Sequence, residues 1–313
     1  MQILNFKENI NFMRLRLPAQ IFSGVLILVS IFSLATNSLN WGLDFTGGTL
    51  IEVGYQQPAK LEHIRKQLQT ADFNDAIVQN FGTSEDVLIR LAPREGVKAA
   101  ILGDQVLGAL RSDGEQVDMR RIEFVGPNVG DELAEQGGLA MLTALICIMF
   151  YVAVRFEWRL ALSSVIALAH DVIITLGLFS ILQLEFDLTV LAAVLAVIGY
   201  SLNDTIVVFD RIRENFLKIR KAEPAEVIDT SLTQTMSRTI ITSGTTILVL
   251  IALFVKGGAL IHGFATALLF GIFIGTYSSI YVASAIALML GVKKEDLMPT
   301  EVEKEGADQD PMI

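Results

Sequence analysis

The sequence predicts an α-helical membrane protein with six transmembrane helices and one α+β domain of the ferredoxin-like type between helices 1 and 2. Three observations carry this prediction. Of the 313 residues, 52% are hydrophobic, which is more than a soluble domain of this size usually contains. Six apolar runs approach or exceed the roughly 20 residues that cross a hydrocarbon core about 30 Å thick. A long segment with strand and helix patterns separates the first two runs.

The apolar runs divide the chain into domains. They lie at residues 17–35, 139–154, 160–182, 188–209, 240–255 and 263–290. We therefore expect a cytoplasmic N-terminus (1–16), transmembrane helix 1 (17–36), a periplasmic α+β domain (37–136), a five-helix transmembrane domain (137–290) and an acidic cytoplasmic tail (291–313).

The segment between the first two spans has the pattern of a βαββαβ domain. Short apolar alternations predict strands, and apolar residues at helical spacing predict helices. The expected elements, in order, are a strand at 49–55, a helix at 58–70, strands at 76–81 and 86–91, a helix at 97–110 and a strand at 119–125. This order is typical of the ferredoxin-like arrangement. After it, Gly126 and Pro127 break the last strand, and a helix beginning at Asp131 is expected to continue into the second span.

The distribution of basic residues predicts the orientation in the membrane. All but one of the basic residues in the short connections fall on one side of a six-span chain, and the opposite connections contain only Lys256. The positive-inside rule therefore places both termini in the cytoplasm. The net charge of −10 argues against a nucleic-acid partner. The basic residues are Arg14, Arg16, Arg155, Arg159, Arg211, Arg213, Lys218, Arg220, Lys221, Lys293 and Lys294.

Asp204, in the fourth apolar run, is the first candidate functional residue. A charged side chain at the centre of a bilayer costs about 2.5–3.5 kcal/mol on insertion scales, so it usually pairs, lines a cavity or carries protons. Arg238 opens the fifth run, which is antiparallel to the fourth, so we expect the two side chains at similar depth and able to pair. Two interpretations stay open: a permanent ion pair that fixes helix packing, and a carboxylate that gains and loses a proton as the pair opens and closes.

Further polar residues occur at membrane depth. His170 and Asp171 lie near the middle of the third run, with Asp171 expected deeper than Asp204. For His170, a packing role as donor to a neighbouring carbonyl competes with a functional one. Asn203 precedes Asp204. On the fifth helix, a spacing of three and four residues predicts a single polar stripe, formed by Ser231, Thr235, Arg238, Thr242 and Thr245.

Glycines indicate turns and close contacts. The segment 42–49 is rich in glycine but lacks the lysine and spacing of a phosphate loop, so we interpret it as a tight turn. Gly47, Gly48, Gly126 and Pro127 are the turn or hinge candidates. Gly271 and Gly275, four residues apart in the sixth run, predict close helix packing. No cofactor or metal site is expected.

Several of these segments together resemble the SecD/SecF family of bacterial protein-export subunits, on its SecF side, within the resistance-nodulation-division (RND) superfamily. The resemblance runs from about Trp41 to the end of the sixth span. The segments that carry it are 42–48 (GLDFTGG), 124–127 (FVGP), 169–171 (AHD), 198–208 (IGYSLNDTIVV), 210–215 (DRIREN), 237–239 (SRT) and 242–243 (TS).

The resemblance implies a partner and a function. It implies a subunit without enzyme activity in the bacterial inner membrane, assembled with SecD, YajC and the SecYEG channel. Such a subunit uses the proton motive force to promote export of preproteins, through movement of its periplasmic domain. By position, Asp204 and Arg238 match the family's proton-pathway residues, with His170, Asp171, Asn203 and Thr242 as supporting polar residues. The family's other essential carboxylate belongs to the SecD half.

Three other functions compete with this one. An intramembrane hydrolase would use Ser243 with His170, or Asp171 with Asp204. The serine version lacks a glycine two residues before Ser243, and the aspartyl version lacks one directly before Asp204. A drug or lipid exporter of the same superfamily usually carries about twice as many spans on one chain. A scaffold that only holds SecD in place is the third.

Overall fold

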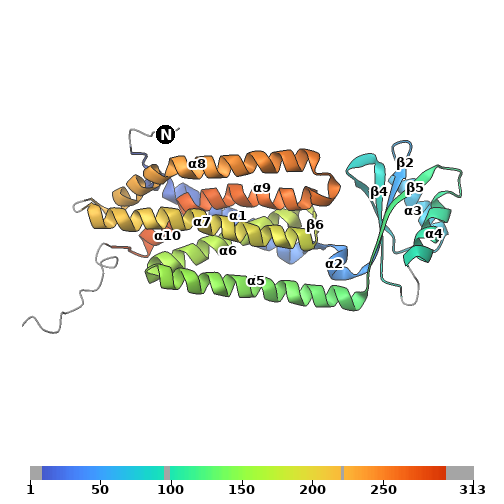
Figure 1. Ribbon diagram of the computed structural model, residues 1–313, viewed down its shortest axis with the longest axis horizontal. Coiled ribbons are helices and arrows are strands. Elements are labelled where there is room, and N and C mark those ends of the chain that lie inside the picture. Colours follow the sequence, from blue (N-terminus) through green and yellow to red (C-terminus); the bar gives the residue numbers. More distant parts are fainter. Residues whose placement is uncertain (1–8, 95–98, 220–221, 294–313) are drawn as a thin grey trace, which may run out of the picture.

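The computed structural model describes residues 9–94, 99–219 and 222–293. The molecule is elongated, with a helix bundle at one end and an α+β domain at the other (Figure 1). Six helices in the described residues are long and apolar enough to cross a membrane, so the predicted fold class is confirmed. Arg220, Lys221, Lys294 and most of the acidic tail lie outside the described residues.

The membrane helices extend beyond the apolar runs that predicted them. The fourth continues past Phe209 to Lys218, and the fifth begins at Pro224. These extensions pack on each other, because Asn215 Nδ2 donates to Ser231 Oγ (2.9 Å). The helices are α1 (Arg16–Asn37, preceded by the 3₁₀ turn η1, Phe12–Leu15), α5 (Pro127–Arg155), α6 (Trp158–Leu182), α7 (Leu188–Lys218), α8 (Pro224–Lys256) and α9 (Ala259–Ser278), continued by η2 (Ser279–Ala283) and α10 (Ser284–Met289).

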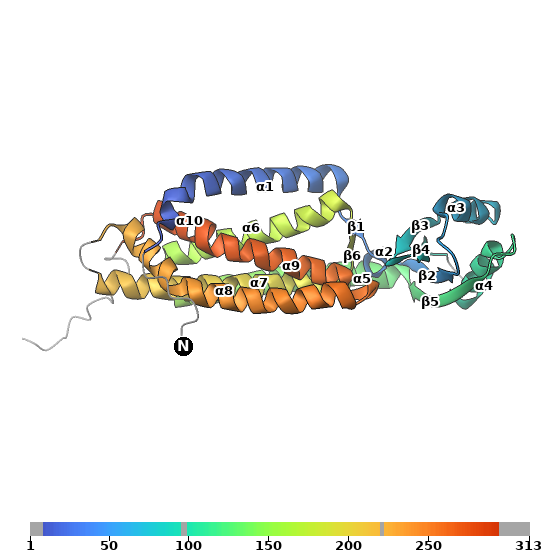
Figure 2. The ribbon, with the colours of Figure 1, turned by 90° about the horizontal axis from the view of Figure 1, so that it is seen from above.

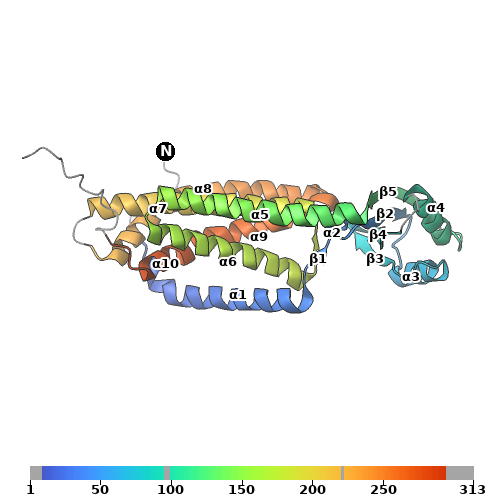
Figure 3. The same cartoon turned by 90° about the horizontal axis from the view of Figure 1, so that it is seen from below.

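Three helices form the centre of the bundle and three lie outside. In their most apolar windows, 56% of the residues of α6, α7 and the α9 span are buried, against 17% or less in α1, α5 and α8. Figure 2 shows α1 at one edge of the bundle, and Figure 3 shows α5 running along its length to the α+β domain. The outer helices therefore leave broad apolar faces for lipid or a partner.

Glycines bring α7 and α9 close together. A Cβ atom added to Gly271 would lie 2.2 Å from Val197 Cγ2, and one added to Gly275 would lie 3.0 Å from Ser201 Cβ. Small residues allow two membrane helices to approach until their backbones nearly touch. The predicted close contact is confirmed, and it places the C-terminal end of α9 beside the polar part of α7.

The α+β domain has the predicted βαββαβ order. Its antiparallel sheet has the strand order β3-β4-β2-β5, and α3 and α4 supply the apolar residues that pack with one face, among them Ile64 and Leu68 against Ile51 and Ile89. The predicted helix at 58–70 begins at Leu61 instead. The elements are β2 (Gly48–Tyr55), α3 (Leu61–Thr70), β3 (Ile77–Phe81), β4 (Thr83–Leu91), α4 (Ala99–Leu110) and β5 (Val117–Val125).

Two short elements join this domain to the bundle. The strand β1 (Asn40–Trp41) pairs in parallel with β6 (Glu185–Phe186), which connects α6 to α7. The single-turn helix α2 (Leu43–Thr46) follows β1, and Asp44 Oδ2 accepts a hydrogen bond from Leu188 N (3.0 Å) at the start of α7. Both elements are too short for sequence periodicity to indicate them.

Arg90 on β4 strengthens this junction. Its Nη1 donates to Trp41 O (3.0 Å), and its Nη2 pairs with Glu185 Oε1 (2.5 Å). Burial raises the pKa of Glu185 above its ordinary value, although the Arg90 guanidinium acts in the opposite direction. One side chain of the sheet thus holds both β1 and β6.

The glycine candidates occupy turns. Gly47 and Gly48 have φ values of 65° and 124°, a region that favours glycine. A Cβ atom on Gly48 would lie 2.3 Å from Leu91 O. Pro127 is at the start of α5, where a fixed φ and a missing N–H are tolerated, so this helix begins four residues before the predicted Asp131. Only Gly126 separates β5 from α5. The hinge role of these residues stays a prediction.

Candidate functional site

Asp204 is buried in the centre of the bundle and is held by hydroxyl groups. Its side chain is on α7, and the residue is 7% exposed. Thr239 Oγ1 of α8 donates to Asp204 Oδ1 (2.7 Å), and Ser279 Oγ of η2 donates to Oδ2 (2.5 Å). Each carboxylate oxygen therefore has one neutral donor. Neutral donors satisfy a carboxyl group without compensating a negative charge.

The expected ion pair between Asp204 and Arg238 does not form. Arg238 is exposed on the outer face of α8, and its side chain makes no hydrogen bond or ion pair within the described residues. The next residue, Thr239, faces the core in its place. Successive helix residues differ by about 100° in direction, so a one-residue difference turns the guanidinium away from α7.

A second buried carboxylate lies on α6. Asp171 is 0% exposed, and its carboxyl group makes three side-chain hydrogen bonds. Its Oδ1 lies 2.8 Å from His170 Nδ1, and its Oδ2 accepts from Ser201 Oγ of α7 (2.5 Å) and from Ser278 Oγ of α9 (2.7 Å). The expected bond from His170 to a neighbouring carbonyl is replaced by this contact with a carboxylate.

His170 is almost completely enclosed. It is 2% exposed, and its ring stacks on Tyr277 with the ring centroids 6.4 Å apart. Its Nε2 has no hydrogen-bond partner in the described residues. An imidazole that contacts a carboxylate through one nitrogen can share a bound proton with it. His170 and Asp171 can therefore hold a proton between them.

Two consecutive serines connect the carboxylates. Ser278 contacts Asp171 and Ser279 contacts Asp204. They stand where α9 gives way to the π-helical turn η2. On the facing helix, Ser201 and Asp204 are three residues apart, so they lie on the same face of α7. The sequence predicted only that Asp171 lies deeper than Asp204; the two serines place the carboxylates in adjacent sites.

The predicted polar stripe of α8 is divided between two faces. Ser231 and Thr235 are buried, whereas Arg238, Thr242 and Thr245 are exposed. Thr242 Oγ1 donates to the carbonyls of Arg238 and Thr239 in its own helix. Asn203 is also exposed. Among the described residues, the Asp204 carboxylate is hydrogen-bonded by Thr239 and Ser279 and not by Thr242 or Asn203. The interpretation of one continuous stripe is wrong.

Sequence reasoning missed the hydroxyl groups that build the site. Thr239, Ser201, Ser278 and Ser279 are all at least 98% buried. Hydroxyl side chains are common in membrane helices and often bond within their own helix, so no single one stands out. The two consecutive serines in the largely apolar sixth run could have indicated polar partners for the buried carboxylates.

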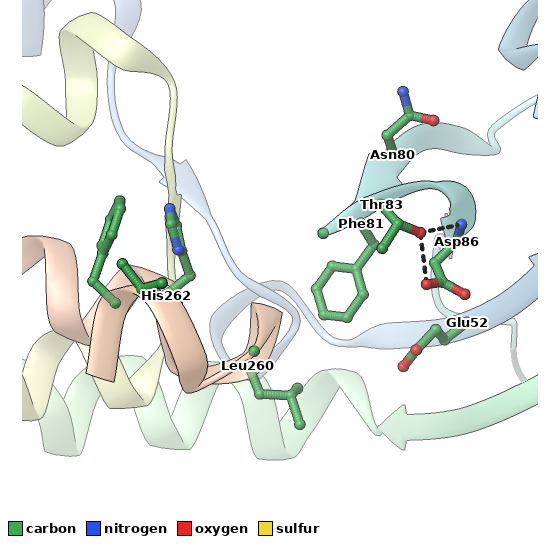
Figure 4. A pocket seen from close by; sticks show the side chains of 11 residues that line it. Glu52, Asn80, Phe81, Thr83, Asp86, Leu260 and His262 are labelled. Atoms are coloured by element: carbon green, nitrogen blue, oxygen red, sulfur yellow. Dashed lines mark hydrogen bonds between the residues drawn. The ribbon is translucent and has the colours of Figure 1, made fainter. Parts of the chain in front are cut away.

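A cleft separates the α+β domain from the ends of α8 and α9. It has a volume of about 850 Å³, and Figure 4 shows Glu52, Thr83 and Asp86 of the sheet across it from Leu260 and His262. The His262 ring lies 4.0 Å from that of Phe254, centroid to centroid. Across the part of the chain that the structure describes, no three histidine, cysteine or acidic side chains lie close enough to hold a metal ion.

Comparisons with known proteins agree with this architecture. Residues 105–293 match the family model described as "Protein export membrane protein SecD/SecF, C-terminal", and residues 32–59 match the "SecD/SecF GG Motif". The protein translocase subunit SecF of Vibrio alginolyticus is 65% identical over 99% of both chains. That of Escherichia coli O157:H7 is 51% identical over 98% of this chain and 96% of its own length.

A solved structure has the same fold. The crystal structure of SecDF, a translocon-associated membrane protein from Thermus thermophilus, matches with a TM-score of 0.83 and 36% sequence identity. The match covers 91% of this chain and 39% of the SecDF chain, so this chain spans about two fifths of that protein. The family models and the full-length relatives lead to one conclusion: the chain belongs to the SecF branch of the SecD/SecF family of protein export membrane proteins.

Proposed function

We propose that this subunit couples proton movement across the inner membrane to the export of preproteins. The environment of Asp204 is the main observation in support of the proposal. Asp204 has a buried carboxyl group in a membrane-spanning helix, and its side-chain hydrogen bonds within the described residues come from neutral hydroxyls. Such a group can hold a proton without strain and can release it when a cation approaches. A proton crossing 100 mV releases about 2.3 kcal/mol, enough to shift a two-state equilibrium more than tenfold.

The exposed Arg238 supports a partner that completes the pathway. An arginine on a lipid-facing surface is unfavourable, so it usually meets another polar group. The outer face of α8 presents it beside Thr242 and Thr245. In this proposal a SecD subunit covers that face and supplies a carboxylate to Arg238. The SecDF chain from Thermus thermophilus, of which this chain covers 39%, supports an association of this kind.

We also propose an orientation and further partners. Both termini lie in the cytoplasm, the α+β domain lies in the periplasm, and the complex works beside the SecYEG channel with YajC. The basic residues next to the ends of the spans support this orientation. Asp204 loses its proton when a cation reaches it, and the resulting rearrangement of α7 and α8 moves the α+β domain against the emerging preprotein.

Vesicles with an imposed proton gradient test the coupling. Asp204→Asn keeps the size of the side chain and removes the proton-binding group. We expect the variant to assemble with the partner but to lose the gradient-dependent part of preprotein export, at least tenfold. Ser163→Ala is the matched control, because Ser163 is also buried and donates only to Leu160 O in its own helix.

The same experiment separates coupling from a scaffold role. Full gradient stimulation in Asp204→Asn, with normal assembly, would overturn the proposal and favour a scaffold. Arg238→Ala is expected to weaken co-purification of a SecD-like partner in mild detergent, whereas Asp204→Asn is not, since Asp204 is enclosed within this chain.

A further inference from the structure

The proposed function leaves the pair of His170 and Asp171 without a role. Both residues are at least 98% buried, and they lie in the centre of the bundle on α6. Asp171 accepts hydrogen bonds from two other helices, and His170 Nε2 has no hydrogen-bond partner among the residues that the structure describes. A fully enclosed histidine and aspartate in contact form a place where a proton can reside.

The charges in the bundle centre do not balance without bound protons. The membrane parts of the inner helices, residues 160–182, 188–209 and 259–289, contain no lysine or arginine. Arg238 of α8 faces outward. Asp204 and Asp171 can carry two negative charges, whereas His170 alone can carry a positive one. Buried charges that are not compensated are strongly unfavourable, so such groups take up protons instead.

The number of protons follows from this count. With His170 positive and Asp171 negative, the centre is neutral only when Asp204 is protonated. With His170 neutral, both carboxyl groups must be protonated. In either arrangement, three side chains share two exchangeable protons. We propose that His170 and Asp171 form a second proton-binding site, coupled to Asp204 through Ser278 and Ser279.

The geometry provides the coupling. Consecutive serines at the start of η2 each donate to a different carboxylate, so reorienting one serine displaces the donor of the other site. π-helical turns often occur at functional positions of helices. Ser201, which donates to Asp171, is one turn from Asp204 on α7. A change of charge at one site is therefore felt at the other through short distances and through a shared segment of chain.

The other titratable groups near the pair are tyrosines. Tyr277 of α9 stacks on His170, and its hydroxyl donates to Ala19 O of α1 (2.8 Å). Tyr281 of η2 lies beside Tyr277. On α7 the nearest titratable groups are Asp204 and Tyr200, and the Tyr200 hydroxyl donates to Ser243 Oγ of α8. Of these, Asp204 is the one carboxyl group.

Infrared difference spectroscopy on the full chain in lipid vesicles tests the second site. His170→Gln removes the imidazole, so Asp171 must hold the proton itself. We expect a protonated carboxyl band at neutral pH that is absent from the double variant with Asp171→Asn. An ionised Asp171 in His170→Gln would overturn the proposal. If His170→Gln does not accumulate, the wild type is compared with Asp171→Asn, where either a carboxyl or an imidazolium band must be lost.

The coupling has its own measurement. The carboxyl band of Asp204 is identified by its loss in Asp204→Asn, and its pH midpoint is then followed. Asp171→Asn removes one of the two carboxyl groups that share these protons, so the midpoint should shift by about one pH unit, the size that marks interacting sites. Ser163→Ala should leave it unchanged. Equal midpoints in the wild type and in Asp171→Asn would overturn the coupling.

This inference rests on the proposed function only for its role in transport. Binding of two protons is measured by spectroscopy without any export. If Asp204→Asn still supports gradient-driven export, coupling to export fails while the two-proton site can stand. If the spectra show a single titrating group, the second site fails while Asp204 can still drive export.

Discussion

At the scale of residues, neutral hydroxyl donors characterise the site. Asp204 and Asp171 together accept four hydrogen bonds from serine and threonine side chains. A hydroxyl can donate to an ionised carboxylate or accept from a protonated one. The surroundings of both acids can therefore remain in place while protons come and go, whereas a fixed arginine would favour the ionised form alone.

The loss of stability in Ser279→Ala indicates whether Asp204 is protonated or ionised in the absence of a proton gradient. A hydrogen bond between neutral groups contributes about 0.5–1.5 kcal/mol to stability, and one to a charged group about 1.5–3 kcal/mol. Because the neutral bundle centre requires a protonated Asp204, we expect Ser279→Ala to lower the free energy of unfolding in detergent by an amount in the smaller range.

Ser284→Ala serves as the reference for this measurement. Ser284 is also buried, but it donates to the backbone carbonyl of Ser279 and not to a carboxylate. A loss in Ser279→Ala within the larger range, relative to this reference, would mean that Asp204 is ionised at rest.

At the scale of elements, the contact between α7 and α9 determines whether the site exists. The glycines of α9 let the helix approach until Gly271 meets Val197 and Gly275 meets Ser201. This close approach brings Ser279 within hydrogen-bond distance of Asp204 on α7. The packing of one helix pair is thus a condition for the chemistry of the site.

A methyl group at Gly271 should separate the two helices. Its Cβ would lie 2.2 Å from Val197 Cγ2, and overpacking of this kind typically costs about 1–3 kcal/mol. We expect Gly271→Ala to lose stability in detergent and to reduce gradient-driven export. Gly244→Ala is the matched control, since a Cβ there has no atom within 4 Å. Equal stability of the two variants would contradict this account.

The elements were largely predictable from the sequence, whereas the contacts of the site were not. Long apolar runs and βαββαβ periodicity are local signals, and they gave the helices and the order of the strands. The partner of Asp204 depends on which face of α8 turns inward, and Arg238 and Thr239 exchange roles over one residue. The strands β1 and β6 are two residues long, and they form through pairing between distant segments that no local pattern indicates.

At the scale of the whole molecule, Arg90 is expected to control how firmly the α+β domain is held. Its side chain joins β4 to β1 and β6, and it is 14% exposed. Removing the Arg90 guanidinium takes one donor from Glu185 and one from the Trp41 carbonyl. We expect Arg90→Ala to accelerate amide hydrogen exchange at Gly42 and in the β1–β6 pair by about tenfold, which corresponds to about 1.4 kcal/mol.

Arg120→Ala is the control for this experiment. Arg120 belongs to the same sheet, but its side chain is 60% exposed and lies 3.9 Å from Asp86, so its loss should have little effect. If both variants exchange alike at these positions, Arg90 does not hold the junction.

The two connections of the α+β domain limit how it can turn. One connection is the β1–β6 junction. The other is α5, a helix of 29 residues that is separated from the sheet by Gly126 alone. A rigid domain that is attached at two points can rotate only about the axis through those points. The cleft of about 850 Å³ between the sheet and the ends of α8 and α9 is free space into which such a rotation can proceed. A displacement of α5 within the bilayer would then rotate the α+β domain, outside the bilayer, in a single plane.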